Sequence, residues 1–216
     1  MERPFLVDGF NEDNRRFGIA SYGASDDLRF NWRYGIYDMA LIQNMGATIT
    51  NDYPMELASR LATTWWYDQT SGGRGYGHLG LASTFAFPGV DPAANGDQDT
   101  RARFRTQPEG RSTNRWLDTG LITGGKSYQI LGIESVINVG SLQLVGEYMN
   151  LWMQREAPAG SAGMGSDIFF HGGYVYLSYF LTGEHIPWNR NLGILGRVKP
   201  LEDFFHLRQG NRIKKS

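Results

Sequence analysis

The segment from Leu28 to Tyr37 alternates apolar and polar residues with a period of two, and this alternation constrains the fold more than any other feature of the sequence. Neighbouring side chains of a β-strand point to opposite faces. One face would carry Leu28, Phe30, Trp32, Tyr34 and Ile36, and the other Arg29, Asn31, Arg33 and Gly35. The segment therefore predicts an amphipathic strand with one aromatic and one cationic face.

Similar strand patterns recur along the chain, separated by turn signals such as Ser25-Asp26-Asp27 and Gly140-Ser141. We expect strands at 15–24, 28–38, 55–68, 76–88, 100–107, 126–139, 142–154 and 168–182. Residues 1–14 and the tail beyond 183 are expected to be irregular. Because most of these strands exceed the globular average of about 5–6 residues, they favour a barrel wall or a large sheet.

The composition agrees with a single all-β domain over residues 1–216, because 28 glycines and an aromatic fraction of 13% suit strands and turns. A net charge of -1 gives no reason to expect nucleic-acid binding. The absence of cysteine removes disulfides and thiolate catalysis, and no two of the four histidines have helical metal-ligand spacing. We therefore expect no metal site, no cofactor and no catalytic residue.

Among the sequence signals for a membrane protein, only that of transmembrane β-strands is compatible with this sequence. The sequence has no run of about 18 apolar residues that would predict a transmembrane helix. Its first residues lack the basic and apolar regions of a signal peptide, so we expect none at this end of the chain. A transmembrane β-strand needs only about 9–11 residues, which the expected strands provide.

A set of basic residues shares the polar faces of the expected strands. Turned toward lipid, an arginine would cost about 2–4 kcal/mol near the membrane midplane, so these faces should meet water. Along a narrow pore they would attract anions, and guanidinium groups suit phosphate because they donate paired hydrogen bonds. The alternative is a solvated strand face with no ligand. The candidate pore-lining residues are Arg29, Arg33, Arg60, Arg101, Arg103, Arg105 and Lys126.

Two carboxylates, Glu134 and Glu147, lie on adjacent expected strands and could face one another. A glycosidase uses such a pair at about 5–10 Å, but charges that balance the arginines on a polar face are the favoured interpretation. An outer-membrane barrel enzyme would need a serine or aspartate beside a histidine near the rim, and only His78 and His171 lie in expected strands. Gly72–Gly75 lacks the ending of a phosphate-binding loop.

Several segments together resemble the phosphate-selective porin O and P family of bacterial outer membranes. No single motif is specific, but their order and spacing along nearly the whole chain are. The segments are Met1–Pro4, Arg16–Ile19, Tyr76–Ala82, Arg103–Glu109, Asp118–Gly120, Leu181–His185 and Gly196–Pro200.

The resemblance implies an antiparallel outer-membrane β-barrel, a homotrimer when full length, that passes small anions such as phosphate or polyphosphate and catalyses no reaction. Family barrels have about 16 strands, so we expect about half of a barrel here, an internal portion without the signal peptide and the C-terminal aromatic strand. The pore lysines of the family do not map onto this sequence. A soluble β-sandwich that binds carbohydrate through exposed aromatic residues is the alternative, because those aromatics fit a sandwich core nearly as well as a membrane interface.

Overall fold

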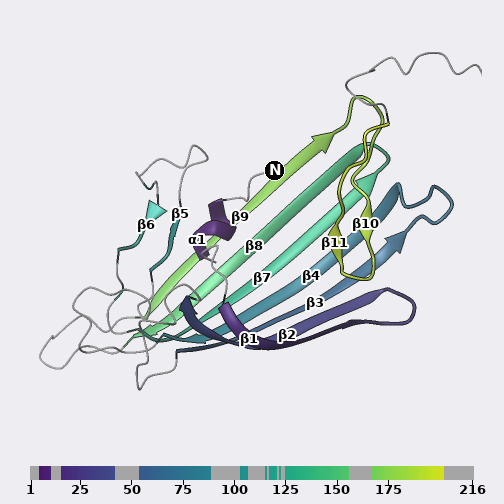
Figure 1. Ribbon diagram of the computed structural model, residues 1–216. Helices are drawn as coiled ribbons and strands as arrows, with labels where there is room; N and C mark the ends of the chain where they lie inside the picture. The colour runs from purple at the N-terminus through teal and green to yellow at the C-terminus, as the bar shows by residue number, and fades with distance from the viewer. Residues whose placement is uncertain are drawn as a thin grey trace, which may run out of the picture.

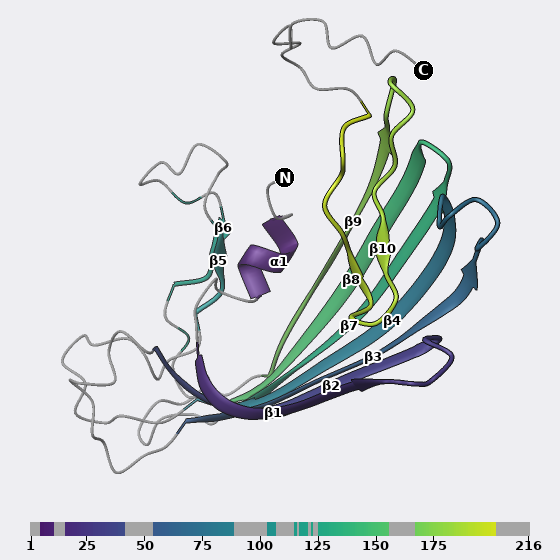
Figure 2. The same ribbon diagram turned by 45° about the vertical axis from the view of Figure 1, so that its right-hand side comes forward.

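A long antiparallel sheet dominates the computed structural model, which describes residues 5–10, 16–41, 54–88, 103–106, 115, 117–120, 122, 125–155 and 167–201. Its seven strands follow one another in the order β1-β2-β3-β4-β7-β8-β9. Figure 1 shows them side by side, and Figure 2 shows that the sheet curves into an arc. The strands are β1 (Arg16–Ala24), β2 (Phe30–Leu41), β3 (Met55–Tyr67), β4 (Gly75–Phe87), β7 (Gly125–Val139), β8 (Leu142–Arg155) and β9 (Ile168–Tyr179).

Short turns with the expected chemistry join three pairs of strands at one end of the sheet. Between β1 and β2, the Ser25 hydroxyl donates to Asp27 Oδ1 at 2.6 Å and the Ser25 amide donates to the Phe30 carbonyl. Between β7 and β8, Gly140 takes a φ of +61°, which glycine adopts without a steric penalty. These turns fix the register of each hairpin, and the register decides which side chains share a face.

The convex face of the sheet is apolar. In β2, β3 and β4 the alternate residues are exposed although they are large and hydrophobic, and the same holds for β7 to β9. Examples are Tyr34, Ile36, Leu57, Leu61, Leu81, Ile133, Leu144, Val175 and Leu177. A contiguous apolar surface of this extent indicates contact with lipid or with another protein.

The concave face is covered at both ends by other parts of the chain (Figure 2). At the end away from the short turns lie helix α1 (Phe5–Phe10) and the paired strands β5 (Arg105–Thr106) and β6 (Leu117–Asp118). There Phe104 and Ile122 form a core with residues of the sheet, and Phe10 packs against this core. The sheet residues of the core are Ala86, Tyr128, Ile130, Leu151 and Met153.

At the other end, strands β10 (Trp188–Asn189) and β11 (Ile194–Leu195) form a hairpin, called the inner hairpin below. It crosses the concave face of the sheet in both views. Trp188 packs there in a second cluster with Tyr76, Val136 and Val145.

The all-β antiparallel fold and seven of the eight expected wall strands are confirmed, and three expectations are wrong. Of the strand expected at 100–107 the structure describes residues 103–106, and these do not join the wall, because β5 is only two residues long and pairs with β6, outside the large sheet. A helical turn lies within 1–14, and the tail beyond 183 contains the inner hairpin. The described residues form one large sheet whose apolar face is exposed, which is not the packing of a β-sandwich.

No helix among the described residues is long and apolar enough to cross a membrane.

Candidate functional site

The middle of the concave face carries a polar belt, which we define as Asn31, Arg33, Arg60, Glu134 and Glu147. The register brings its members together from four strands. Arg33 of β2 lies opposite Arg60 of β3, and Glu134 of β7 lies opposite Glu147 of β8. The belt lies between the two packed ends of the concave face, so it is the stretch of this face that neither apolar cluster occupies.

Arg60 and Glu134 form an ion pair across the intervening strand β4. The Arg60 Nε also donates to Glu134 Oε1 at 3.1 Å, and His78 Nε2 lies 2.7 Å from the same oxygen. The residue of β4 opposite Glu134 is Gly80, where a Cβ atom would stand only 2.5 Å from Glu134 Oε1. Glycine at this position therefore lets the carboxylate lie over β4 and reach the arginine.

The turn of the inner hairpin docks on the belt through its backbone carbonyl oxygens. Arg33 Nη2 donates to the Leu192 carbonyl and Arg60 Nη2 to the Gly193 carbonyl, each at 2.9 Å. The Asn31 amide donates to the carbonyls of Arg190 and Asn191 at 2.9 and 2.8 Å. Two guanidinium groups and one amide thus hold one four-residue turn.

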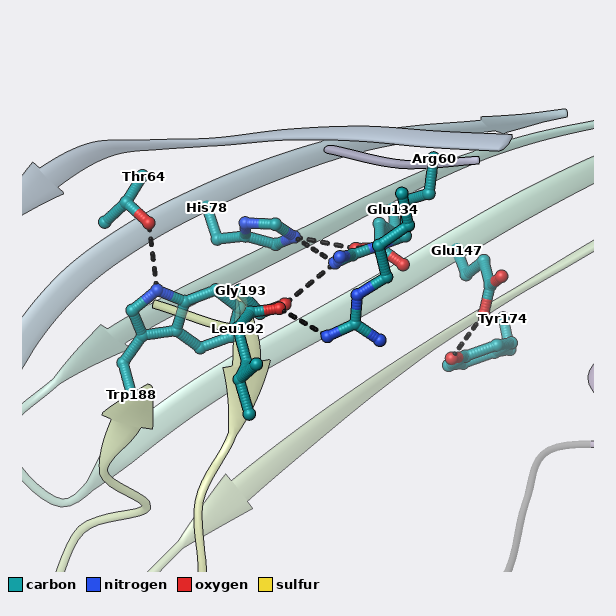
Figure 3. A network of polar contacts seen from close by, with 10 residues as sticks. Arg60, Thr64, His78, Glu134, Glu147, Tyr174, Trp188, Leu192 and Gly193 are labelled. Carbon is teal, nitrogen blue, oxygen red and sulfur yellow. Dashed lines mark hydrogen bonds and ion pairs between the residues drawn. The ribbon is translucent and has the colours of Figure 1, made fainter. Parts of the chain in front are cut away.

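Trp188 anchors the base of the inner hairpin (Figure 3). Its indole N–H donates to Thr64 Oγ1 at 2.9 Å, and its ring lies 4.5 Å from that of His78. The ring also stacks on Tyr76, whose hydroxyl donates to the Ile186 carbonyl at 2.8 Å. Because Trp188 is only 7% exposed, its burial adds apolar stabilisation to these hydrogen bonds.

Glu147 has a different environment from Glu134. It accepts a hydrogen bond of 2.8 Å from the Tyr174 hydroxyl of β9, which is the residue opposite it in that strand pair. Figure 3 shows the two residues apart from the group around Arg60. The expected facing of the two carboxylates is confirmed by the register of β7 and β8.

The described candidate pore-lining residues lie in four places. Arg33 and Arg60 belong to the polar belt on the sheet. Arg29 is exposed in the turn before β2, and Lys126 is exposed near the start of β7, at the opposite end of the sheet from the short turns. Arg103 and Arg105 belong to the β5 segment, where Arg103 Nε donates to Asp118 Oδ1 at 2.8 Å. Arg101 lies outside the described residues.

Sequence reasoning missed Asn31, Tyr76 and Trp188 as anchors of the inner hairpin. The available signal was the turn composition around Asn191 and Gly193, which is typical of hairpins. Nothing in the pattern of the tail indicated that this hairpin contacts strands more than a hundred residues earlier.

Several titratable groups outside the wall strands have pKa values shifted by their neighbours. The Arg103 guanidinium beside Asp118 lowers the pKa of that carboxyl to about 2. The Ser25 hydroxyl donates to the Asp27 carboxylate and lowers its pKa. The side chain of Ser71 lowers the pKa of Asp68, whose carboxylate also accepts hydrogen bonds from the amides of Thr70 and Ser71. Burial, with a contribution from Arg74, lowers the pKa of His185. Among the described residues, no three histidine, aspartate or glutamate side chains gather as a metal site.

A large antiparallel sheet with an apolar convex face, curved around a polar concave face, has the architecture of a transmembrane β-barrel wall. The fold and the belt thus place the chain in the class of barrel-forming membrane proteins. The model of the family "Phosphate-selective porin O and P" matches residues 1–194. The chain therefore belongs to this family of outer-membrane porins, and the resemblance noted from its motifs is confirmed. A comparison with curated proteins finds no match.

Proposed function

We propose that this chain forms part of the wall of an outer-membrane channel through which small anions, such as phosphate or polyphosphate, diffuse, and that it catalyses no reaction. The observation that supports this proposal most is the combination of an exposed apolar convex face with arginines on the opposite face of the same strands. The apolar face of such a sheet can contact lipid while its polar face contacts water. Rings of arginine or lysine give anion preference to pores.

The lengths of the connections between strands indicate which end of the sheet faces the periplasm. Residues 25–29, 68–74 and 140–141 join strands by short turns, whereas 42–54, 88–124 and 156–167 are longer connections at the other end. Outer-membrane barrels have short turns on the periplasmic side and long loops outside the cell. The inner hairpin then narrows the passage on its periplasmic side.

In this proposal the seven basic candidates, Arg29, Arg33, Arg60, Arg101, Arg103, Arg105 and Lys126, face the water-filled passage. Arg33 and Arg60 have the strongest support, because both lie on the concave face and donate to groups that cover it. The convex face contacts lipid, and part of it contacts the neighbouring subunits of a homotrimer.

Recordings from the natural full-length protein in planar bilayers test this function. In a salt gradient we expect a reversal potential of the sign given by anion preference, and a larger current with phosphate than a channel selecting by size alone would carry. Arg33→Gln should reduce the anion preference, whereas Lys199→Gln, which removes an exposed charge beyond β11, should not. A cation-selective wild-type channel would refute the proposal.

A further inference from the structure

The polar belt contains as many acidic as basic groups, and the two kinds are separated across it. Arg33 and Arg60 lie opposite each other on β2 and β3. Glu134 and Glu147 lie opposite each other on β7 and β8. The formal charges of these four side chains cancel. The belt therefore does not by itself favour anions strongly, although it carries the two best-supported arginines.

The two glutamates do not contribute equally to this balance. Glu134 is compensated by the Arg60 guanidinium, with which it forms an ion pair, and it also contacts the His78 ring. An ion passing this level would meet these groups as a nearly neutral unit. Glu147, within the described residues, receives its hydrogen bond from the Tyr174 hydroxyl, which carries no charge. Among the described residues Glu147 forms no ion pair, so its negative charge is compensated less than that of Glu134.

The positions that separate the arginines from the glutamates along the belt carry small residues. In the two rows of paired residues that run from the arginines to the glutamates, the intervening positions on β3, β4 and β7 are Ala62, Gly80, Ala82 and Gly132. The Glu134 carboxylate lies over Gly80 and the buried Met149 lies beside Gly132, whereas the two packed clusters lie toward either end. Glu147 is itself partly exposed, so its carboxylate is accessible to an ion on this face.

We propose that Glu147 is a specificity-determining residue of the channel, whose negative charge limits the preference of this passage for anions. The inference rests on the proposed function, since it assumes that the concave face lines the passage. A carboxylate in a pore attracts cations and repels anions, which is the opposite of the effect of the arginines. Its removal leaves the belt with one net positive charge.

The expected effect is a change in ion selectivity that depends on salt concentration. A unit charge about 5 Å from an ion in water changes the occupancy of that ion about fourfold. Glu147→Gln should therefore raise the occupancy of anions and lower that of cations by about fourfold each in dilute salt. The ratio of anion to cation permeability, measured from reversal potentials in planar bilayers, should then rise by up to about 16-fold. In about 1 M salt, where the screening length is about 3 Å, the increase should nearly vanish.

Two matched variants separate charge from structure. Glu147→Asp keeps the charge and should keep the wild-type ratio. Tyr174→Phe removes the hydroxyl partner but no charge, and it should also leave the ratio unchanged. Glu147→Met provides a second neutral side chain of similar length if the Gln variant does not fold, as judged by heat-modifiable migration on gels.

The outcomes distinguish this inference from the function on which it rests. A folded, conducting Glu147→Gln channel with the wild-type ratio would overturn the role of Glu147 and leave the anion channel standing. A similar increase for Tyr174→Phe or Glu147→Asp would also overturn it, because the effect would then come from structure. A wild-type channel that is cation-selective would refute the proposed function itself, whatever the variants do.

Discussion

Replacing Gly193 with alanine should release the turn of the inner hairpin from the polar belt. Gly193 has a φ of +60°, and a Cβ atom added there would stand 2.7 Å from Asn31 Oδ1 and 3.5 Å from an Arg60 nitrogen. The Asn31 side chain cannot move aside easily, because it is 2% exposed and donates two hydrogen bonds to the same turn. The added methyl group must therefore push the turn away.

The cost has two parts that can be separated. A left-handed backbone conformation costs alanine about 1–2 kcal/mol. Displacement of the turn then breaks at least one charge-assisted hydrogen bond, from Arg33 to Leu192 or from Arg60 to Gly193, and such bonds contribute about 1.5–3 kcal/mol each. The second part alone shifts the population of undocked hairpin by about 10- to 150-fold.

Gly140 provides the matched control. Its φ is +61°, and nothing lies within 4 Å of a Cβ atom added there. Gly140→Ala therefore introduces the same backbone strain as Gly193→Ala without a steric clash. Only Gly193→Ala should undock the hairpin.

Limited trypsin digestion after Arg190, in the folded protein, measures the undocked population. When opening is fast compared with cleavage, the cleavage rate follows the equilibrium population of the open form. We expect Gly193→Ala to accelerate cleavage at this site by at least tenfold and Gly140→Ala to leave it near the wild-type rate. Equal rates for the two alanine variants would refute the docking argument, because the clash with Asn31 would then not displace the turn.

Three further substitutions test other parts of the structure. Trp188→Phe removes the indole donor to Thr64 and should destabilise the hairpin by about 1–3 kcal/mol, seen as faster cleavage after Arg190. Leu81→Arg on the convex face should reduce the free energy of unfolding from bilayers by about 2–4 kcal/mol in urea titrations, and a loss near zero would contradict a lipid-facing assignment. Because the pKa of Asp118 is lowered to about 2 from the ordinary value of 3.8, its ion pair with Arg103 stabilises the β5–β6 pair fully above pH 3.8 and is lost as the pH falls through 2. For this exposed pair the effect should stay below about 1 kcal/mol, and Asp118→Asn should abolish this pH dependence of amide exchange in β5.

The wall strands were predictable because the two faces of such a strand meet different environments, and its apolar and polar residues therefore alternate with a period of two. The alternation from Leu28 to Tyr37 predicted the faces of β2, and the aromatic members are exposed on the convex face. The facing of Glu134 and Glu147 was predictable for a related reason. A two-residue turn at Gly140-Ser141 leaves one register for the hairpin, so the pairing follows from counting residues.

The contacts of the concave face follow from no such local rule. Arg60 and Gly193 are separated by 133 residues, and their contact exists only because the inner hairpin returns to the sheet that the earlier strands have built. The alternation at Arg103 and Arg105 misled for the same reason, since alternation predicts a strand but not the sheet to which it belongs. Within the described part of the chain, β5 pairs with β6 and not with the wall. A strand pattern assigns a side chain to a face, whereas its electrostatic role depends on what long-range folding places against it. Alternation assigns Arg60, Glu134 and Glu147 to the same polar face. In the fold, Arg60 is compensated by Glu134 across Gly80, whereas Glu147 is hydrogen-bonded to a neutral tyrosine.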